Sequence, residues 1–381
     1  MDDVSLLKLG LTKDEKKTFE KKKVELSKRV GSLLKASRAD SKNAECFICG
    51  KECSSFCNSH SVPQFCLQNI SVSGKLYHSG NLVDIPMLDK DKGIGEADTF
   101  RIICRDCDSS VFSDYENPEA YCQVPSDKML AQIAMKNYLK SISKRQLEIQ
   151  LYRNMAKEFG EHEMMIHMEG IGSTDLREYI DEFKYAKKAC QSKWDNNYYL
   201  SYFESIPYVV PIAFQNDIAL VSDIEGSTIN NIYNHLSDYV IKSVHICVFP
   251  LANHSVVMMF CRYGENRYSK FFKQFKKLSS EEKLKVINYI IFSYSEDYYF
   301  YKGIDQEIFG NESLKDVVKT TSVSVGDNPF ADSLTAAKET YDLNKRDTIP
   351  NFLSETYKVN IKSDIISDPN QSDFGGQNHI S

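Results

Sequence analysis

Apolar residues recur at helical spacing in the first part of the chain. Between residues 12 and 37 they fall at positions typical of one face of an amphipathic helix, namely Phe19, Val24, Leu26, Val30, Leu33 and Leu34. Thr12 can cap the start of this helix, and Glu15 stands three residues later, as in a capping box. Lysine and arginine crowd the polar face. We interpret that face as a solvated surface, with contact to a nucleic-acid backbone as the alternative.

A second helical pattern covers residues 126–159, as one long helix or two joined helices. Ser126 can cap its start, and Met129, Ile133, Leu139 and Ile142 supply an apolar stripe. Basic residues lie between these apolar positions: Lys128, Lys136, Lys140, Lys144 and Arg145. They form either a solvated face or, through Lys128, Lys136 and Lys140, a surface that contacts phosphates.

From about residue 206 the pattern changes to short, β-branched apolar runs separated by turn residues. These runs predict strands over 206–214, 217–223, 243–251 and 255–263, and the last two are expected to form a hairpin that turns between Pro250 and His254. Ser279 and Glu282 then form a capping box for a helix that continues towards residue 301. Beyond about residue 310, small and polar residues dominate, which predicts a partly disordered tail.

Composition places the chain among ordinary globular proteins. It has 381 residues, of which 42% are hydrophobic and 26% charged, and its net charge of −6 gives no global polycationic signature. No apolar run approaches ~20 residues, so no membrane span is predicted. The first residues lack the pattern of a secretory signal, and we therefore expect a cytoplasmic protein.

The eleven cysteines are unevenly distributed, and seven of them fall within about sixty residues: Cys46, Cys49, Cys53, Cys57, Cys66, Cys104 and Cys107. Clustering of this kind in a reducing compartment indicates metal binding rather than disulfides.

Two Cys-x-x-Cys pairs carry the strongest signal. Cys46 with Cys49, and Cys104 with Cys107, can complete a closed site of four thiolates for a structural Zn²⁺. The 54 residues between the pairs exceed the ~15–20 of a compact zinc ribbon, so insertion loops must be accommodated. A competing set of Cys53, Cys57 and His60 would need a fourth ligand from Cys66 or His78.

The segment SHSVPQF (residues 59–65) carries a family resemblance. The first cysteine pair, then His60 followed by Pro63, then a predicted strand at 99–103 that enters the second pair, and then a polar helix together resemble the HNH endonuclease family. That family embeds a ββα-metal nuclease motif in a treble-clef zinc module. The resemblance covers roughly residues 46–121.

The resemblance implies specific roles for the residues near His60. His60 would be the general base that activates water, a role that suits its reference pKa of about 6.5. A catalytic Mg²⁺ or Mn²⁺ would polarise the phosphate. The family often places Asp or His just before the base and His on the following helix; this chain has Ser59 before the base, and after the second pair it offers the carboxylates of Asp108, Asp114 and Glu116. Asp108 is the first choice as a metal ligand. Asn69 and Asn81 are candidates for the central asparagine of the motif.

Together these patterns predict an α+β fold with an N-terminal treble-clef/ββα-metal zinc module, flanking helices and a C-terminal α+β domain. The expected segments are a basic N-terminal helix (1–45), an HNH-like zinc module (46–125), a helical connector (126–200), an α+β domain for regulation, assembly or recognition (201–309) and a polar tail (310–381).

Two functions follow from these predictions. The first is a metal-dependent endonuclease that hydrolyses nucleic acid, with DNA as the expected substrate, and a role in anti-phage defence would extend the resemblance. The alternative is a non-catalytic treble-clef zinc protein that binds nucleic acid or a protein partner. A protein partner or a second copy of the chain could bind through the C-terminal domain.

Overall fold

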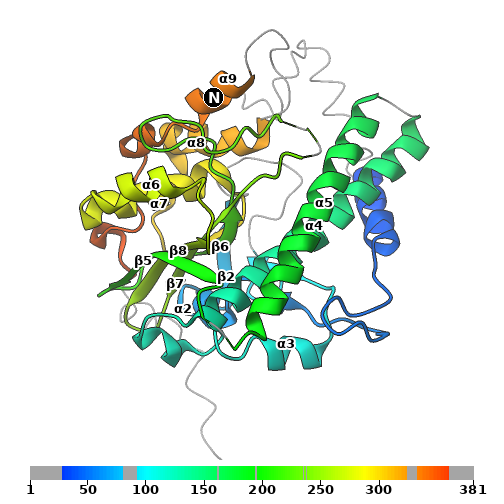
Figure 1. Ribbon diagram of the computed structural model, residues 1–381, viewed down its shortest axis with the longest axis horizontal. Helices are drawn as coiled ribbons and strands as arrows, with labels where there is room; N and C mark the ends of the chain where they lie inside the picture. Colours follow the sequence, from blue (N-terminus) through cyan, green and yellow to red (C-terminus); the bar gives the residue numbers. More distant parts are fainter. Residues whose placement is uncertain are drawn as a thin grey trace, which may run out of the picture.

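The fold is built around one antiparallel sheet with helices on both faces (Figure 1). The computed structural model describes residues 28–79, 92–160, 163–193, 195–234, 236, 238–323 and 333–359. Within them the chain has an α+β fold, and seven strands pair in the order β3-β2-β9-β6-β7-β8-β5. Their bounds are β2 (Lys75–His78), β3 (Lys92–Gly93), β5 (Tyr198–Ile206), β6 (Ile212–Ile218), β7 (Val244–Pro250), β8 (Ser255–Arg262) and β9 (Tyr298–Phe300).

The central strands confirm the predicted hairpin, but the strand predicted at 206–214 is divided and the one predicted at 217–223 is wrong beyond Ile218, where β6 ends. β7 and β8 pair from His245↔Phe260 to Pro250↔Ser255, and Leu251 donates its N–H to the carbonyl of His254 across the turn. The run at 206–214 is not one strand, because β5 ends before Pro207 and β6 begins after Pro211. Proline has no N–H to donate to a ladder, so the two prolines bound a turn there.

Helices α4 (Asp127–Phe159) and α5 (Glu163–Cys190) pack against each other as a long hairpin (Figure 1). The predicted cap is confirmed, because the Ser126 hydroxyl accepts from the N–H of Met129 at 3.3 Å. Residues 28–40 form another helix beside α4, and the Asn154 amide of α4 donates to the Ser37 hydroxyl and the Asp40 carboxylate. The predicted helix at 12–37 is therefore observed over 28–37; residues 12–27 lie outside the described residues.

The N-terminal half of α4 is buried on more than one side. Every residue from 129 to 139 is buried, because this part of the helix lies between the sheet and the cysteine-rich segment. Polar side chains at the helix–sheet interface bond to one another: Gln215 of β6 donates to Asn137, whose amide contacts His245 Nδ1 of β7 at 3.0 Å. The His245 ring also stacks on Phe260 at 4.7 Å.

Burial of His245 makes stability depend on pH. Burial lowers the pKa of His245 to about 3, so the unfolded chain takes up a proton below about pH 6.5 that the folded chain does not. Above pH 6.5 this group does not lower the free energy of unfolding. As the pH falls from 6.5 towards 3, the free energy of unfolding decreases by about 1.4 kcal/mol per pH unit.

Urea unfolding at pH 7 and pH 5 checks this expectation. Wild type should lose about 2 kcal/mol more than His245→Gln between these pH values. Asp217, whose burial raises its pKa to about 6, acts with the opposite sign, and the difference between the two proteins removes its effect. Equal losses in both would contradict the assignment.

Helices α6 (Ser269–Lys276), α7 (Ser280–Tyr294) and α8 (Glu312–Val323) lie on the other side of the sheet from α4 (Figure 1). Ser279 caps α7 as predicted, accepting from the N–H of Glu282 at 3.3 Å. The predicted continuation of this helix to residue 301 is wrong, because α7 ends at Tyr294 and residues 298–300 form β9.

The tail predicted to be polar and partly disordered (310–381) is ordered over its described parts. It contains α8, α9 (Ser333–Thr340) and the 3-10 turns η4 (Leu343–Thr348) and η5 (Glu355–Tyr357). Leu314, Val318, Phe352 and Leu353 are fully buried. These few apolar side chains pack the segment against α7 and β9. The average composition of the segment does not reveal them.

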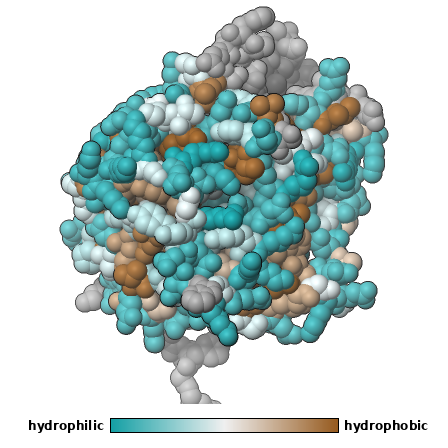
Figure 2. Space-filling view, in the orientation of Figure 1, coloured by the Kyte–Doolittle hydropathy of each residue, from teal (hydrophilic) through white to brown (hydrophobic). Residues whose placement is uncertain are grey.

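The predicted boundary between a zinc module and a C-terminal domain does not separate two cores. β2, from within 46–125, pairs with β9 through Tyr77↔Phe300 and His78↔Tyr299. One hydrophobic cluster runs from Cys46 to Leu353. The face seen in Figure 2 is mostly hydrophilic, with apolar side chains in small groups. Among the described helices, none is long and apolar enough to cross a bilayer.

Candidate functional site

The first cysteine pair lies on a tight turn. Cys46 donates its N–H to the carbonyl of Lys51 at 2.9 Å, and Gly50 donates to the carbonyl of Cys46 at 2.8 Å. Gly50 has a φ of 70°, a left-handed conformation that glycine adopts without steric cost. The turn therefore directs the side chains of Cys46 and Cys49 to one side.

The second cysteine pair lies at the start of helix α3 (Arg105–Val111). Cys104 is the residue before the helix and Cys107 lies in its first turn. Cys104 also donates its N–H to the Cys46 sulfur at 3.2 Å, which joins the two pairs directly. Across the described chain this is the single group of His, Cys, Asp and Glu side chains with metal-site spacing, and its four ligand atoms lie within 4.8 Å of one another.

The donor set fits a metal ion. Cys49 Sγ lies 3.9 Å from Cys104 Sγ, close to the ~3.8 Å edge of a tetrahedron with metal–sulfur distances of ~2.3 Å. All four cysteines are free thiols. Burial opposes ionisation of Cys46, but hydrogen bonds from backbone N–H groups, those of Cys49 and Cys104 among them, outweigh it and lower its pKa to about 7. The predicted ligands are thus brought together and could hold a metal ion such as zinc.

The competing cysteine set is not assembled in the described residues. Cys53 donates to the carbonyl of Lys51, Cys57 hydrogen-bonds to Asp108, and Cys66 is buried in the apolar core. Burial, with the Asp108 charge second, raises the pKa of Cys57 to about 12, so this thiol stays protonated.

His60 lies on a two-stranded antiparallel sheet next to the cysteine cluster. β1 (Ser59–His60) pairs antiparallel with β4 (Thr99–Phe100), and α3 follows four residues after β4. His60 is half-buried, and its Nε2 lies 2.9 Å from the carbonyl oxygen of Ile94. β1, β4 and α3 thus follow one another in the order that the sequence predicted. β4 covers only two residues of the predicted strand at 99–103.

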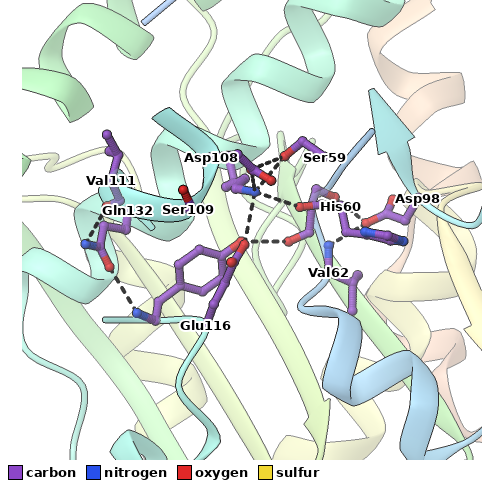
Figure 3. A network of polar contacts seen from close by, with 12 residues as sticks. Ser59, His60, Val62, Asp98, Asp108, Ser109, Val111, Glu116 and Gln132 are labelled. Carbon is purple, nitrogen blue, oxygen red and sulfur yellow. Dashed lines mark hydrogen bonds and ion pairs between the residues drawn. The ribbon is translucent and has the colours of Figure 1, made fainter. Parts of the chain in front are cut away.

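Asp108 faces the residue that precedes His60 (Figure 3). The Ser59 hydroxyl donates to Asp108 Oδ1 at 2.6 Å, so the position before the histidine and the helix carboxylate are in contact. The Lys136 ammonium of α4 donates to the same oxygen at 2.6 Å. Burial alone would raise the pKa of Asp108, but the Lys136 charge and the hydrogen bonds to this carboxylate outweigh it and lower the pKa.

Glu116 also pairs with Lys136, whereas Asp114 pairs with a different lysine. Glu116 Oε1 lies 3.0 Å from Lys136 Nζ, and burial raises its pKa, partly offset by the lysine. Asp114 instead pairs with Lys128 at 2.9 Å and accepts from the Gln132 amide at 2.6 Å. The three predicted carboxylate ligands therefore do not form one site. Asn69 donates to the carbonyl of Pro250, and Asn81 lies outside the described residues.

The predicted phosphate contacts on α4 need correction. The Lys136 side chain is 1% exposed, and Lys140, which is 12% exposed, pairs with Asp98 and Asp297. Neither ammonium can reach a phosphate in this fold. Lys128 is exposed, although it is paired with Asp114. The helical pattern predicted a solvated face for these lysines. It cannot show that the cysteine-rich segment covers this side of α4 while the sheet covers the other.

A catalytic divalent ion does not fit the arrangement. The place between Ser59, Asp108 and Glu116 is occupied by Lys136 Nζ, which lies within 3.0 Å of an oxygen of each. The sequence reasoning missed this lysine as a partner of the carboxylates. The sequence signal for a buried lysine was its place among apolar residues of a helical pattern, in AQIAMKNYL.

The resemblance to the HNH family rests on a few motif residues. Two features of the structure bear on function: the four-cysteine cluster at the start of α3, and the Lys136 ammonium beside His60. Comparison of the chain with protein-family models, with curated proteins and with solved structures gives no match.

Proposed function

We propose that this protein is a zinc-scaffolded treble-clef protein of the HNH type that binds nucleic acid without cleaving it. A zinc ion on Cys46, Cys49, Cys104 and Cys107 would join the turn to α3 and hold the paired strands β1 and β4 against it. The order of cysteine turn, paired strands β1 and β4, and a helix with ligands at its start supports a treble clef.

The observation that carries the absence of cleavage is the position of Lys136. Hydrolysis of the HNH type needs a divalent ion beside the general base. Here Lys136 donates to Ser59, Asp108 and the carbonyl of His60, and it pairs with Glu116. A protein-supplied cation therefore stands where the resemblance places the metal.

A basic surface beside the cysteine turn supports nucleic-acid binding. Residues 28–54 contain six lysines and arginines and three acidic residues, against a net charge of −6 for the whole chain. All six basic residues are exposed, on the helix at 28–40 and on the turn next to it: Lys28, Arg29, Lys35, Arg38, Lys42 and Lys51. Exposed lysines and arginines on one face are the usual contacts for phosphates.

Charge reversal tests this surface. Lys35→Glu with Arg38→Glu should weaken binding to a fluorescent DNA duplex at least tenfold and reduce the salt dependence of binding by about one unit of log–log slope per residue. Fluorescence anisotropy at several salt concentrations provides both quantities. The matched control is Lys273→Glu with Lys277→Glu, exposed residues at the end of the molecule near α6, far from the helix at 28–40 (Figure 1). Equal weakening by both pairs would contradict a specific surface.

The second candidate is the nuclease itself, and one observation favours it. Asp108 and Glu116 are 25% and 33% exposed, so solvent reaches the carboxylates next to His60. Incubating wild type and His60→Ala with plasmid DNA and Mg²⁺ or Mn²⁺ separates the candidates. We expect no cleavage by either protein. Cleavage by wild type that His60→Ala abolishes would replace the binding proposal with the enzyme.

A further inference from the structure

We infer that a cavity between α5 and the sheet binds a small organic cation of the short aliphatic diamine class. The cavity has a volume of about 150 Å³, and its walls come from α4, α5, β6, β8 and the segment that leads into β7. Its volume equals that of about five waters at ~30 Å³ each, which is room for a molecule of this size. Five of its lining side chains carry carboxyl groups: Asp175, Glu178, Glu182, Asp217 and Glu265.

Ion pairs neutralise two of these carboxylates. Glu182 faces both basic residues of the lining, because its Oε1 lies 3.6 Å from Lys242 Nζ and 3.4 Å from Arg262 Nη1. Asp175 Oδ2 lies 3.0 Å from Arg145 Nη2, which comes from α4. Three cations therefore stand against five carboxyl groups, and the cavity is acidic.

The other carboxyl groups have no lysine or arginine partner among the described ion pairs. Two of them accept hydrogen bonds from uncharged groups instead: Glu178 from the N–H of Ile241, and Asp217 from the Ser141 hydroxyl at 3.4 Å. Burial raises the pKa of Glu178 and raises that of Asp217 to about 6. A cation inside the cavity would stabilise the ionised form of both groups.

The spacing of these carboxyl groups favours an organic cation over a metal ion. Within the described part of the chain, the cysteine cluster is the single group of three or more His, Cys, Asp and Glu side chains that could surround one ion. No three carboxylates of the cavity can therefore coordinate one metal together. A diamine carries its two charges at opposite ends of a flexible chain, so each ammonium can reach a different carboxylate.

Two tyrosine rings suit the body of such a ligand. Tyr138 and Tyr179 both line the cavity, with ring centroids 6.5 Å apart and ring planes at 34°. The face of an aromatic ring attracts an ammonium group. The same faces can pack against the methylene groups of the ligand.

The Tyr138 hydroxyl keeps hydrogen-bonding capacity for a ligand, although this residue is only 6% exposed. Gln215 donates to Asn137 Oδ1, so the Asn137 amide nitrogen faces His245 Nδ1 and donates to it. Burial keeps the His245 ring neutral, and its one proton therefore lies on Nε2, 3.3 Å from Tyr138 Oη. The hydroxyl oxygen thus accepts from Nε2–H and retains a second lone pair, which can accept from an ammonium in the cavity.

Isothermal titration calorimetry with 1,4-diaminobutane, in the absence of DNA, tests this site. Wild type should bind the diamine at least tenfold more tightly than n-butylamine, which carries one charge, and should not bind the uncharged 1,4-butanediol. Asp217→Asn and Glu178→Gln each remove one charge with little change of shape, and each should weaken diamine binding at least tenfold. Asp181→Asn, on the same helix α5 but exposed and paired with Lys184, is the matched control and should bind as wild type does.

Thermal unfolding with and without the diamine gives a second readout, because a ligand that binds the native protein raises its Tm. The diamine should raise the Tm of wild type and Asp181→Asn, and not that of Asp217→Asn. If Asp217→Asn does not fold, Glu178→Gln decides, since Glu178 lies outside the hydrophobic core.

The inference is overturned if wild type does not bind the diamine, if it binds the diol equally well, or if the variants that fold keep wild-type affinity. Displacement of the diamine by an equal concentration of Mg²⁺ would also overturn it, in favour of a metal site. These readouts do not involve DNA, so they are independent of the proposed function.

Discussion

Cys104→Ser is expected to release the metal from the four-cysteine cluster and to destabilise the paired strands β1 and β4 and the helix α3 beside it. Cys104 contributes a sulfur 3.9 Å from that of Cys49, and its N–H binds the sulfur of Cys46. Structural zinc sites have apparent binding free energies on the order of 10 kcal/mol, so loss of the site should remove several kcal/mol of stability. We expect this large loss because the described cysteine-rich segment has few regular elements, and its strands β1 and β4 are only two residues long.

Metal analysis and urea unfolding measure this effect. Wild type should contain one zinc per chain and Cys104→Ser close to none, and a strong chelator should reduce the stability of wild type alone. Cys53→Ser is the matched control, because this thiol lies nearby and donates to the carbonyl of Lys51 outside the cluster. Wild type without zinc, or Cys104→Ser that retains it, would remove the proposed scaffold.

Asp98→Ala is expected to cost about 3–5 kcal/mol of unfolding free energy, the usual loss when one partner of a buried charge pair is removed. The Asp98 side chain is 0% exposed and pairs with Lys140 of α4. It also accepts from the N–H of Val62 at 2.5 Å and from the Ser61 hydroxyl. The substitution would leave Lys140 with Asp297 alone, at 3.4 Å.

Urea denaturation of three variants isolates this effect. Asp98→Asn keeps the shape and an acceptor for Val62 but no charge, so its loss should lie between those of wild type and Asp98→Ala. Asp181→Ala, which breaks an exposed pair with Lys184, should change stability by less than about 1 kcal/mol. The assignment fails if Asp98→Ala loses no more than Asp181→Ala.

Local features were predictable because their partners are close in sequence. The caps at Ser126 and Ser279 bond to the third residue after them, and the β7–β8 turn closes over four residues. The cysteine cluster joins segments 55 residues apart, yet it was predicted as well. Each Cys-x-x-Cys pair is a local structure, and the chemistry of a closed metal site requires two such pairs.

The direction of the α4 lysines could not be predicted from the helical pattern. Periodicity separates apolar from polar positions, and it assigns a lysine to the solvated side by default. Lys136 is buried because its partners come from β1, α3 and the turn after α3, between 20 and 77 residues away. The pairing of β2 with β9 was missed for a similar reason, since strands of four and three residues show little periodicity.

By itself the sequence determined the α+β class, the helix caps, the β7–β8 hairpin and the four cysteines that could hold a metal. These depend on contacts within a few residues or on the chemistry of one side-chain type. Only the tertiary structure decided that the cysteine-rich segment shares one core with the sheet, and that the cation beside His60 is Lys136. Both depend on which distant segments pack together. A buried charged group is stable only when it is paired, and its partner is decided by the segments that the fold brings near it.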